Sequence, residues 1–308
     1  MIFPVADGHC DYLYGAVQSG YRLDSQKRNQ VVNLAGLQAG HVALQFFACW
    51  TDTSLHTPPL HQCLSMIDAY DRMLEEHPEL TPFTRGFTPE SGKIATVLTV
   101  EGGEAVDRSL AMLRMLHRMG VRAMTLTWNE NNELAGAAMD RGNKGLTPIG
   151  RDIIDEMCRI NMAIDVSHLS DRGIDEILSR TTRPIFASHS NARSVCDSPR
   201  ALKDEHIRAI AAQGGVMGVN FYYEQLTGRG KACIDDVVRH ICHMAEVGGV
   251  NCCAIGSDFD GMQTYPTDLR SGRDLPALLA ALSKAGFSDE ELYRIAYKNL
   301  SSYIAQFV

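Results

Sequence analysis

Short apolar runs alternate with amphipathic segments along the whole chain. Runs such as residues 94–100 and 163–167 are almost continuously apolar, which is typical of strands covered on both faces, as in a parallel sheet. Between them, apolar residues recur at helical spacing, for example over residues 109–119 and 151–159. Eight runs predict strands, at residues 3–6, 42–49, 94–100, 123–127, 163–167, 184–188, 216–220 and 253–257.

Eight strand-and-helix alternations within 308 residues predict an α/β fold of the TIM type, a single (β/α)₈ barrel over residues 1–308. Further helices are expected over residues 170–179, 204–213 and 235–247. A doubly wound open sheet is the alternative, but its ligands would cluster at one crevice. Residues 128–145 follow the fourth run and lack helical periodicity, so we expect either a substrate wall or an ordinary surface loop there.

Composition excludes several classes of function. A formal net charge of -8 leaves no basic surface for nucleic acid, and no apolar stretch approaches the ~20 residues of a membrane span. Nine cysteines, an odd number without a Cys-x-x-Cys pair, are typical of buried free thiols in a reducing compartment. Since no secretory signal is visible either, we expect a cytoplasmic protein without membrane or nucleic-acid partners.

Potential metal ligands follow several of the apolar runs. His9 and Asp11 are two residues apart, so on an extended strand both project to one face and could bind one zinc or similar ion. A polar strand end is an equally good interpretation of this pair alone. Glu101 follows residues 94–100 and could bridge two metals with its two oxygens, although a single glutamate is more often an exposed loop residue.

Two histidines and one aspartate complete the candidate site. His168 and His189 end neighbouring predicted strands, so their imidazoles could share a second metal. Asp258 follows the last predicted strand, where a carboxylate suits a proton shuttle facing the metals. Single histidines at strand ends are usually hydrogen-bonded, and it is their recurrence that favours metal binding.

These motifs together resemble the membrane (renal) dipeptidase family of zinc metallopeptidases, family M19. The similarity extends from residue 7 to about residue 300, and the order of the motifs is more specific than any one of them. The motifs are Asp7-Gly8-His9-Cys10-Asp11, Glu101-Gly102-Gly103, Ile164-Asp165-Val166-Ser167-His168, Ser188-His189-Ser190 and Gly256-Ser257-Asp258-Phe259-Asp260-Gly261.

The resemblance implies a metal-dependent hydrolase barrel with two zinc ions per chain that cleaves dipeptides. It implies a first metal held by His9, Asp11 and Glu101, and a second held by Glu101, His168 and His189. It also assigns Asp258 as the acid and base, and Arg200 as the clamp for the substrate carboxylate, a task that suits a bidentate guanidinium. A homodimer and a bacterial-like cytosolic member are implied as well.

One position departs from the family. The animal enzymes carry a histidine that contacts the substrate after the fourth strand, whereas Trp128 and then Asn129 stand here. Trp128 and Asn129 are therefore expected to contact the substrate. Asn129 or Asn132 could donate a hydrogen bond in place of the imidazole, or a metal could stabilise the oxyanion alone.

Other functions remain compatible with the same residues. A deamidase, a lactonase, a β-lactam hydrolase or another amide hydrolase could use the same metal pair, because the loops set the substrate. Related barrel deaminases and TatD-like nucleases open with His-x-His, and the His9-Cys10-Asp11 order argues against them. An inactive barrel that only binds a ligand is the alternative from another class.

Overall fold

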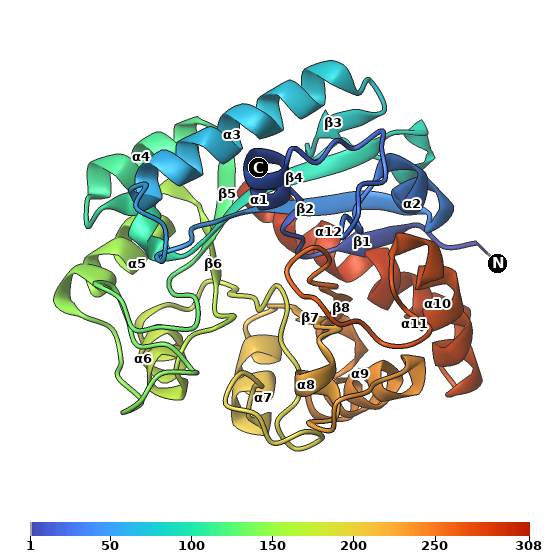
Figure 1. Ribbon diagram of the computed structural model, residues 1–308. Helices are drawn as coiled ribbons and strands as arrows, with labels where there is room; N and C mark the ends of the chain where they lie inside the picture. Colours follow the sequence, from blue (N-terminus) through green and yellow to red (C-terminus); the bar gives the residue numbers. More distant parts are fainter. Residues whose placement is uncertain (1) are drawn as a thin grey trace.

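A parallel sheet runs through the centre of the protein in this computed structural model, which describes residues 2–308. Its strands are β1 (Val5–Asp7), β2 (Val42–Trp50), β3 (Leu80–Pro82), β4 (Ile94–Glu101), β5 (Val121–Thr125), β6 (Ala163–Asp165), β7 (Met217–Val219) and β8 (Cys253–Ile255). Seven of them follow the order β6-β5-β4-β2-β1-β8-β7, while β3 pairs with β4 beside this path. The predicted α/β class with parallel strands is confirmed, and Figure 1 shows the strands enclosed by helices.

The sixth predicted strand, residues 184–188, is a correction to the expectation of a regular eight-stranded barrel. This segment bridges β6 and β7 only through two isolated pairs, Asp165 with Phe186 and Ala187 with Met217. Beyond these pairs, side chains replace ladder bonds, since Ser188 N donates to the Asp165 carboxylate at 3.0 Å. The sheet is therefore a TIM-like half-barrel of seven strands that does not close fully as a continuous ladder.

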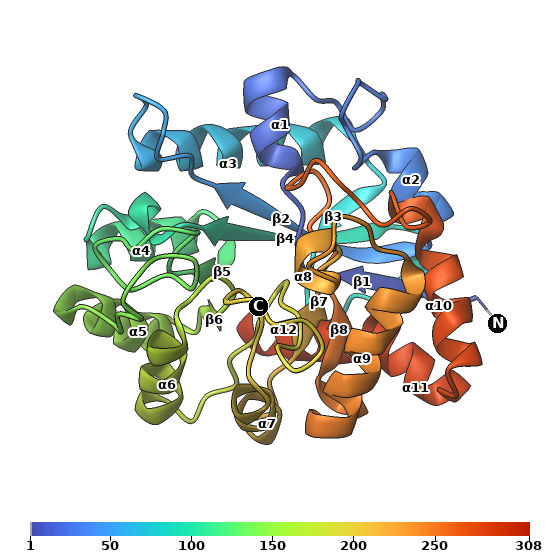
Figure 2. The ribbon, with the colours of Figure 1, turned by 60° about the horizontal axis from the view of Figure 1, so that its bottom comes forward.

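Helices cover the outside of the sheet (Figure 2). Serine and threonine caps begin several of them; Ser109, Thr147 and Ser170 accept bonds from backbone N–H groups of the first turn. The five helices named from periodicity lie within two or three residues of their predicted bounds. The helices are α1 (Tyr12–Ser19), α2 (Leu34–Ala39), α3 (Pro59–Glu76), α4 (Leu110–Arg118), α5 (Pro148–Ile160), α6 (Asp171–Arg180), α7 (Asp204–Ala212), α8 (Tyr223–Leu226), α9 (Ile234–Gly248), α10 (Leu275–Lys284), α11 (Asp289–Tyr293) and α12 (Asn299–Ile304).

The space enclosed by the strands has its own small core. Alanines such as Ala6 and Ala95 line it together with Phe46 and Phe186, and the C-terminal segment fills it with Tyr303. The Tyr303 hydroxyl donates to Pro184 O at 3.2 Å, so the tyrosine finds a partner despite complete burial. Because α12 contacts β1 and β8 from this side, apolar packing occupies one end of the sheet and polar residues can gather at the other.

None of the helices in residues 2–308 combines the length and the apolar character that crossing a bilayer requires.

Candidate active site

The polar side chains singled out in the sequence meet at the carboxyl ends of the strands. This is the end of a parallel sheet at which barrel enzymes and open α/β enzymes place their active sites. All six are at most partly exposed to solvent. They are His9 and Asp11 after β1, Glu101 as the last residue of β4, His168 after β6, His189 after residues 184–188, and Asp258 after β8.

His9 lies at the centre of an acidic group. Its Nε2 is 3.5 Å from Asp11 Oδ2, 3.5 Å from Glu101 Oε2 and 4.0 Å from Asp258 Oδ1. Gly261 makes room for this group, because a Cβ at that position would lie 2.2 Å from Asp11 Oδ2 and 2.3 Å from Asp258 Oδ1. A side chain at position 261 would therefore displace these two carboxylates.

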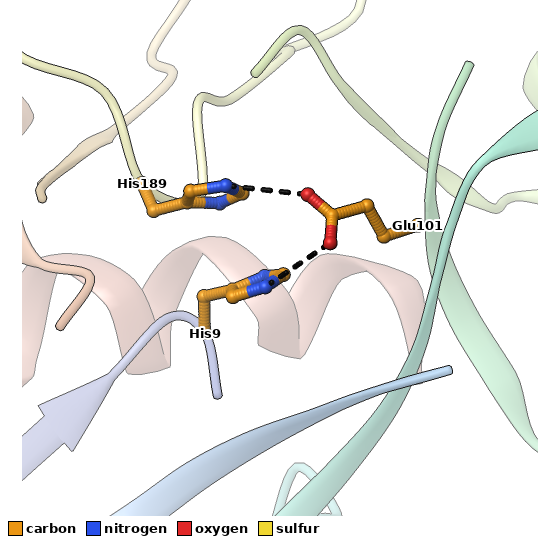
Figure 3. Close-up of side chains that lie close together, drawn as sticks. All are labelled: His9, Glu101 and His189. Carbon is orange, nitrogen blue, oxygen red and sulfur yellow. Dashed lines mark ion pairs between the residues drawn. The ribbon is translucent and has the colours of Figure 1, made fainter. Parts of the chain in front are cut away.

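Glu101 joins this group to a second one formed by two imidazoles. Its Oε1 lies 2.9 Å from His168 Nε2 and 3.3 Å from His189 Nε2, and these two nitrogens are 2.9 Å apart. In Figure 3 one oxygen of Glu101 faces His189 and the other faces His9. Glu101 thus presents one oxygen to each of the two groups.

The outer nitrogens of both imidazoles are already hydrogen-bonded. His168 Nδ1 lies 2.9 Å from Asn129 Oδ1, which is an acceptor, so the ring donates there. His189 Nδ1 lies 2.7 Å from Ser188 Oγ, and that hydroxyl donates onward to Ser167 Oγ at 3.4 Å. Both rings thus carry hydrogen on Nδ1 and direct an Nε2 lone pair toward Glu101, which is the tautomer of a metal-binding histidine.

Electrostatics in the site favour a positive charge among the carboxylates. Burial alone would lower the pKa of His9, but Glu101 and Asp11 outweigh it and raise the pKa well above its ordinary value. Burial also acts against the charge on Glu101, yet the positive charge that His9 carries beside it holds the pKa of Glu101 well below its usual range. Burial lowers the pKa of His168 to about 4 and keeps its ring neutral.

The donor set fits a divalent metal. Within residues 2–308, His9 Nε2, Asp11 Oδ1 and Glu101 Oε1 are buried and have no hydrogen-bond partner, which is costly unless a cation receives them. Imidazole nitrogens and carboxylate oxygens are the ligands that zinc takes in enzymes. Two sets have ligand atoms within 4.8 Å of one another: His9, Glu101 and His189, and His9, Asp11 and Asp258.

A cavity of about 1150 Å³ opens onto these groups. Arg200 lines it and is only 5 % exposed; its Nη1 donates to Ser190 Oγ at 3.1 Å and its Nη2 to His189 O at 3.2 Å. Burial lowers the pKa of Arg200 to about 10, so it remains a cation at neutral pH. Its Nε is buried without a partner among the described residues, and a bound carboxylate could supply one.

Trp128 and Asn129 both line the cavity, but they are placed differently. The ring of Trp128 packs edge-on against Trp50 at 5.0 Å and lies 6.3 Å from the ring of His168. The Oδ1 of Asn129 accepts the hydrogen bond from His168 Nδ1. Asn132 is turned into its own loop, where it donates to Leu126 O at 2.7 Å, so this geometry does not support it as a substrate donor.

Several residues of the site were missed by the sequence analysis. Trp50 ends β2, pairs in register with Glu101 and packs against Tyr14, and both aromatic residues line the cavity. Asn220 Nδ2 donates to Asp258 Oδ2 at 2.9 Å and holds that carboxylate. Trp50 directly follows the predicted run 42–49 and Asn220 ends the predicted run 216–220, so inspecting every residue at the end of a run, and not only potential metal ligands, would have found both.

Comparisons with known proteins identify relatives along the length of the chain. An uncharacterised dipeptidase of Schizosaccharomyces pombe is 33% identical over 97% of the chain and 79% of its own length. Dipeptidase 3 of Rattus norvegicus is 31% identical over 97% of the chain, which spans 64% of the rat protein.

Solved structures show the same fold. A metallopeptidase from Rhodobacter sphaeroides, crystallised with a phosphinate mimic of the dipeptide L-Ala-D-Ala, superposes with a TM-score of 0.92 at 24% identity over the full length of both chains. A dipeptidase of family M19 gives a TM-score of 0.91 at 24% identity, over 100% of this chain and 99% of the other. The family model for membrane dipeptidase (peptidase family M19) matches residues 2–306, and the chain therefore belongs to this family.

Proposed function

We propose that this protein hydrolyses the peptide bond of dipeptides and holds two zinc ions to do so. The observation that carries the proposal is the convergence of buried imidazole nitrogens and carboxylate oxygens on Glu101. His9 Nε2 and Asp11 lie on one side of it, and the Nε2 atoms of His168 and His189 lie on the other. Membership of a dipeptidase family supports the reaction class.

His9, Asp11 and Glu101 would hold one metal, and Glu101, His168 and His189 would hold the other. When bound, such a metal pair supplies a water of lowered pKa and a Lewis acid for the carbonyl oxygen. The chain contributes the orientation of these ligands. Asn129 and Ser188 fix the two imidazole tautomers from behind, which keeps both Nε2 lone pairs available.

Asp258 is placed to move the proton. Asn220 holds its Oδ2, and its Oδ1 faces His9 at 4.0 Å. Burial, together with the charges of Asp11 and Glu101, raises the pKa of Asp258 to about 7. A carboxyl with such a pKa can take the proton of the attacking water and return it to the departing amine at neutral pH.

Arg200 would fix the free carboxylate of the substrate. A carboxylate bound to its unpaired Nε would satisfy both groups and place the scissile bond over Glu101. The aromatic wall formed by Trp50 and Trp128 would receive an apolar side chain, and Trp128 in this wall replaces the polar contact made by the animal enzymes.

The proposal is tested with purified protein stripped by a chelator and assayed with a panel of L,L and L,D dipeptides. We expect no turnover in the stripped protein, recovery with zinc, and about two bound metal equivalents in the active form. Dipeptide amides, which lack the terminal carboxylate, serve as the control and should be poor substrates. Hydrolysis by the stripped protein, or equal rates for acid and amide, would contradict the proposal.

Three finer features belong to the same proposal. We infer a homodimer and a cytoplasmic location from the family resemblance and from the cysteine usage of the sequence. We also infer that residues 184–188 complete a single (β/α)₈ domain as an irregular last strand, because their two bridges connect β6 and β7, the two ends of the strand order.

A further inference from the structure

Arg200 lies in a loop, residues 189–202, that leaves the sheet at His189 and folds back on itself. Arg193 N donates to Leu202 O at 2.8 Å, and Leu202 N donates to Asn191 O at 2.8 Å. These bonds join the two ends of the loop but leave the stretch around Arg200 to be fixed by other contacts.

Within this stretch Ala201 N donates to Ser198 O at 3.0 Å and Arg200 N to Ser198 Oγ at 3.3 Å, and the side chain of Arg193 ties the stretch to the rest of the protein. Its Nη2 donates to Pro199 O at 3.0 Å and to Ala201 O at 2.7 Å, and its Nε donates to Ala201 O at 3.0 Å. The two carbonyls belong to the residues immediately before and after Arg200. One guanidinium therefore holds the backbone on both sides of the residue that faces the cavity.

Arg193 is itself anchored to the segment that carries His168. Its Nη1 and Nη2 each donate to one oxygen of Asp171 at 2.7 Å, with side-chain exposures of 21% and 18% for the pair. Asp171 is the first residue of α6 and comes three positions after His168. Lys203 Nζ lies 3.2 Å from the same carboxylate and adds a second cation.

We propose that Arg193 is a positioning residue that sets the placement of Arg200 relative to the metal centre. The inference rests on the proposed role of Arg200 as the carboxylate clamp. The loop carrying Arg200 and the segment carrying His168 are joined through one bidentate ion pair between Arg193 and Asp171. The planar fork of arginine can serve a carboxylate and two carbonyls at once, whereas a lysine offers one point charge.

The consequence is a defect in binding. When a substrate-binding group is misplaced by about 1 Å, the efficiency of an enzyme can fall about 100-fold. We therefore expect Arg193→Met to raise KM for dipeptides about 10- to 100-fold. The value of kcat should change by less than about threefold, since uniform binding energy appears in KM alone. Arg193→Lys should raise KM by less than Arg193→Met does.

A double-mutant cycle with Arg200→Ala separates positioning from general structure. If Arg193 acts through Arg200, Arg193→Met has no further effect on KM once Arg200 is gone. The matched control is Arg180→Met, which removes another two-bond arginine–aspartate pair, with Asp155, on the outside of the protein. This control should leave KM unchanged.

Each outcome decides the matter. An unchanged KM in Arg193→Met, or an equal loss in the Arg200→Ala background, overturns the role of Arg193. If Arg193→Met does not fold, Asp171→Asn is the substitute variant, because asparagine keeps the shape of the aspartate that pairs with Arg193. This variant must also raise KM, by a smaller factor. A wild-type protein without dipeptidase activity contradicts the proposed function itself, which is a different result from active protein with unchanged KM in the variant.

Discussion

His168 Nε2 and His189 Nε2 lie 2.9 Å apart, and both face Glu101 Oε1. Because each ring donates from Nδ1 to a neighbouring residue, the three facing atoms are all acceptors. A cation among them would satisfy all three atoms at once, and buried acceptors without such a partner are costly.

We therefore expect metal binding to stabilise the fold. Zinc at about 100 times its Kd should add about 2.7 kcal/mol to the free energy of unfolding and raise Tm by several degrees. Thermal unfolding of chelated protein with and without added zinc measures the effect. Glu101→Gln is the control, because it removes the shared carboxylate charge and should reduce the shift. Identical Tm values with and without zinc would show that this cluster binds no metal.

Asn129 should control the affinity for metal through His168. Asn129→Ala removes the acceptor for His168 Nδ1, and loss of such a partner typically lowers metal affinity about 10- to 100-fold. Competition with a chromogenic chelator measures the change. Gln263→Ala alters another amide of the cavity, at an exposed position, and should leave the affinity unchanged. An effect on KM alone would instead favour direct contact between Asn129 and the substrate.

Asp258→Asn should retain the metals and lose turnover. The amide can still pair with Asn220 but cannot accept the proton of the water, and loss of a general acid or base costs about 10²- to 10⁴-fold in rate. Measuring kcat together with metal content separates the two effects. Full activity in this variant would rule out the proton-shuttle role.

Glu156 should make the stability of the protein depend on acid pH. Bonds from Arg159 and Arg114 hold the pKa of Glu156 at about 2, below its ordinary value of 4.5, and tie α5 to α4. A lowered pKa stabilises the fold above pH 4.5, and this contribution is lost as pH falls toward 2.

The size of this contribution is limited by solvent, because the arginine side chains are 37% and 63% exposed. Glu156→Gln should therefore cost about 1 kcal/mol at pH 7, less than the full pKa shift would give. Urea unfolding at pH 7, 5 and 3.5 should show the gap between variant and wild type narrowing at the lowest pH. A gap that stays constant with pH would assign the loss to packing.

Local patterns in the sequence predicted most of the strands and the candidate ligands. The apolar run before Glu101 indicates a strand because burial on both faces leaves no room for polar residues, and the structure has β4 there. The spacing of His9 and Asp11 similarly indicates that both side chains reach one place. Such features depend on only a few neighbouring residues. The preference of apolar side chains for buried positions produces the same local pattern in any fold.

Only the tertiary structure decided how distant residues combine. Residues 184–188 do not form a regular strand because the Asp165 carboxylate takes the Ser188 N–H that a ladder would use. Asn129 contacts His168, and Arg193 holds the backbone around Arg200, although no periodicity marks either residue. These contacts depend on strand register and on loops that meet across the sheet, and short-range hydrophobic patterning carries no information about such distances.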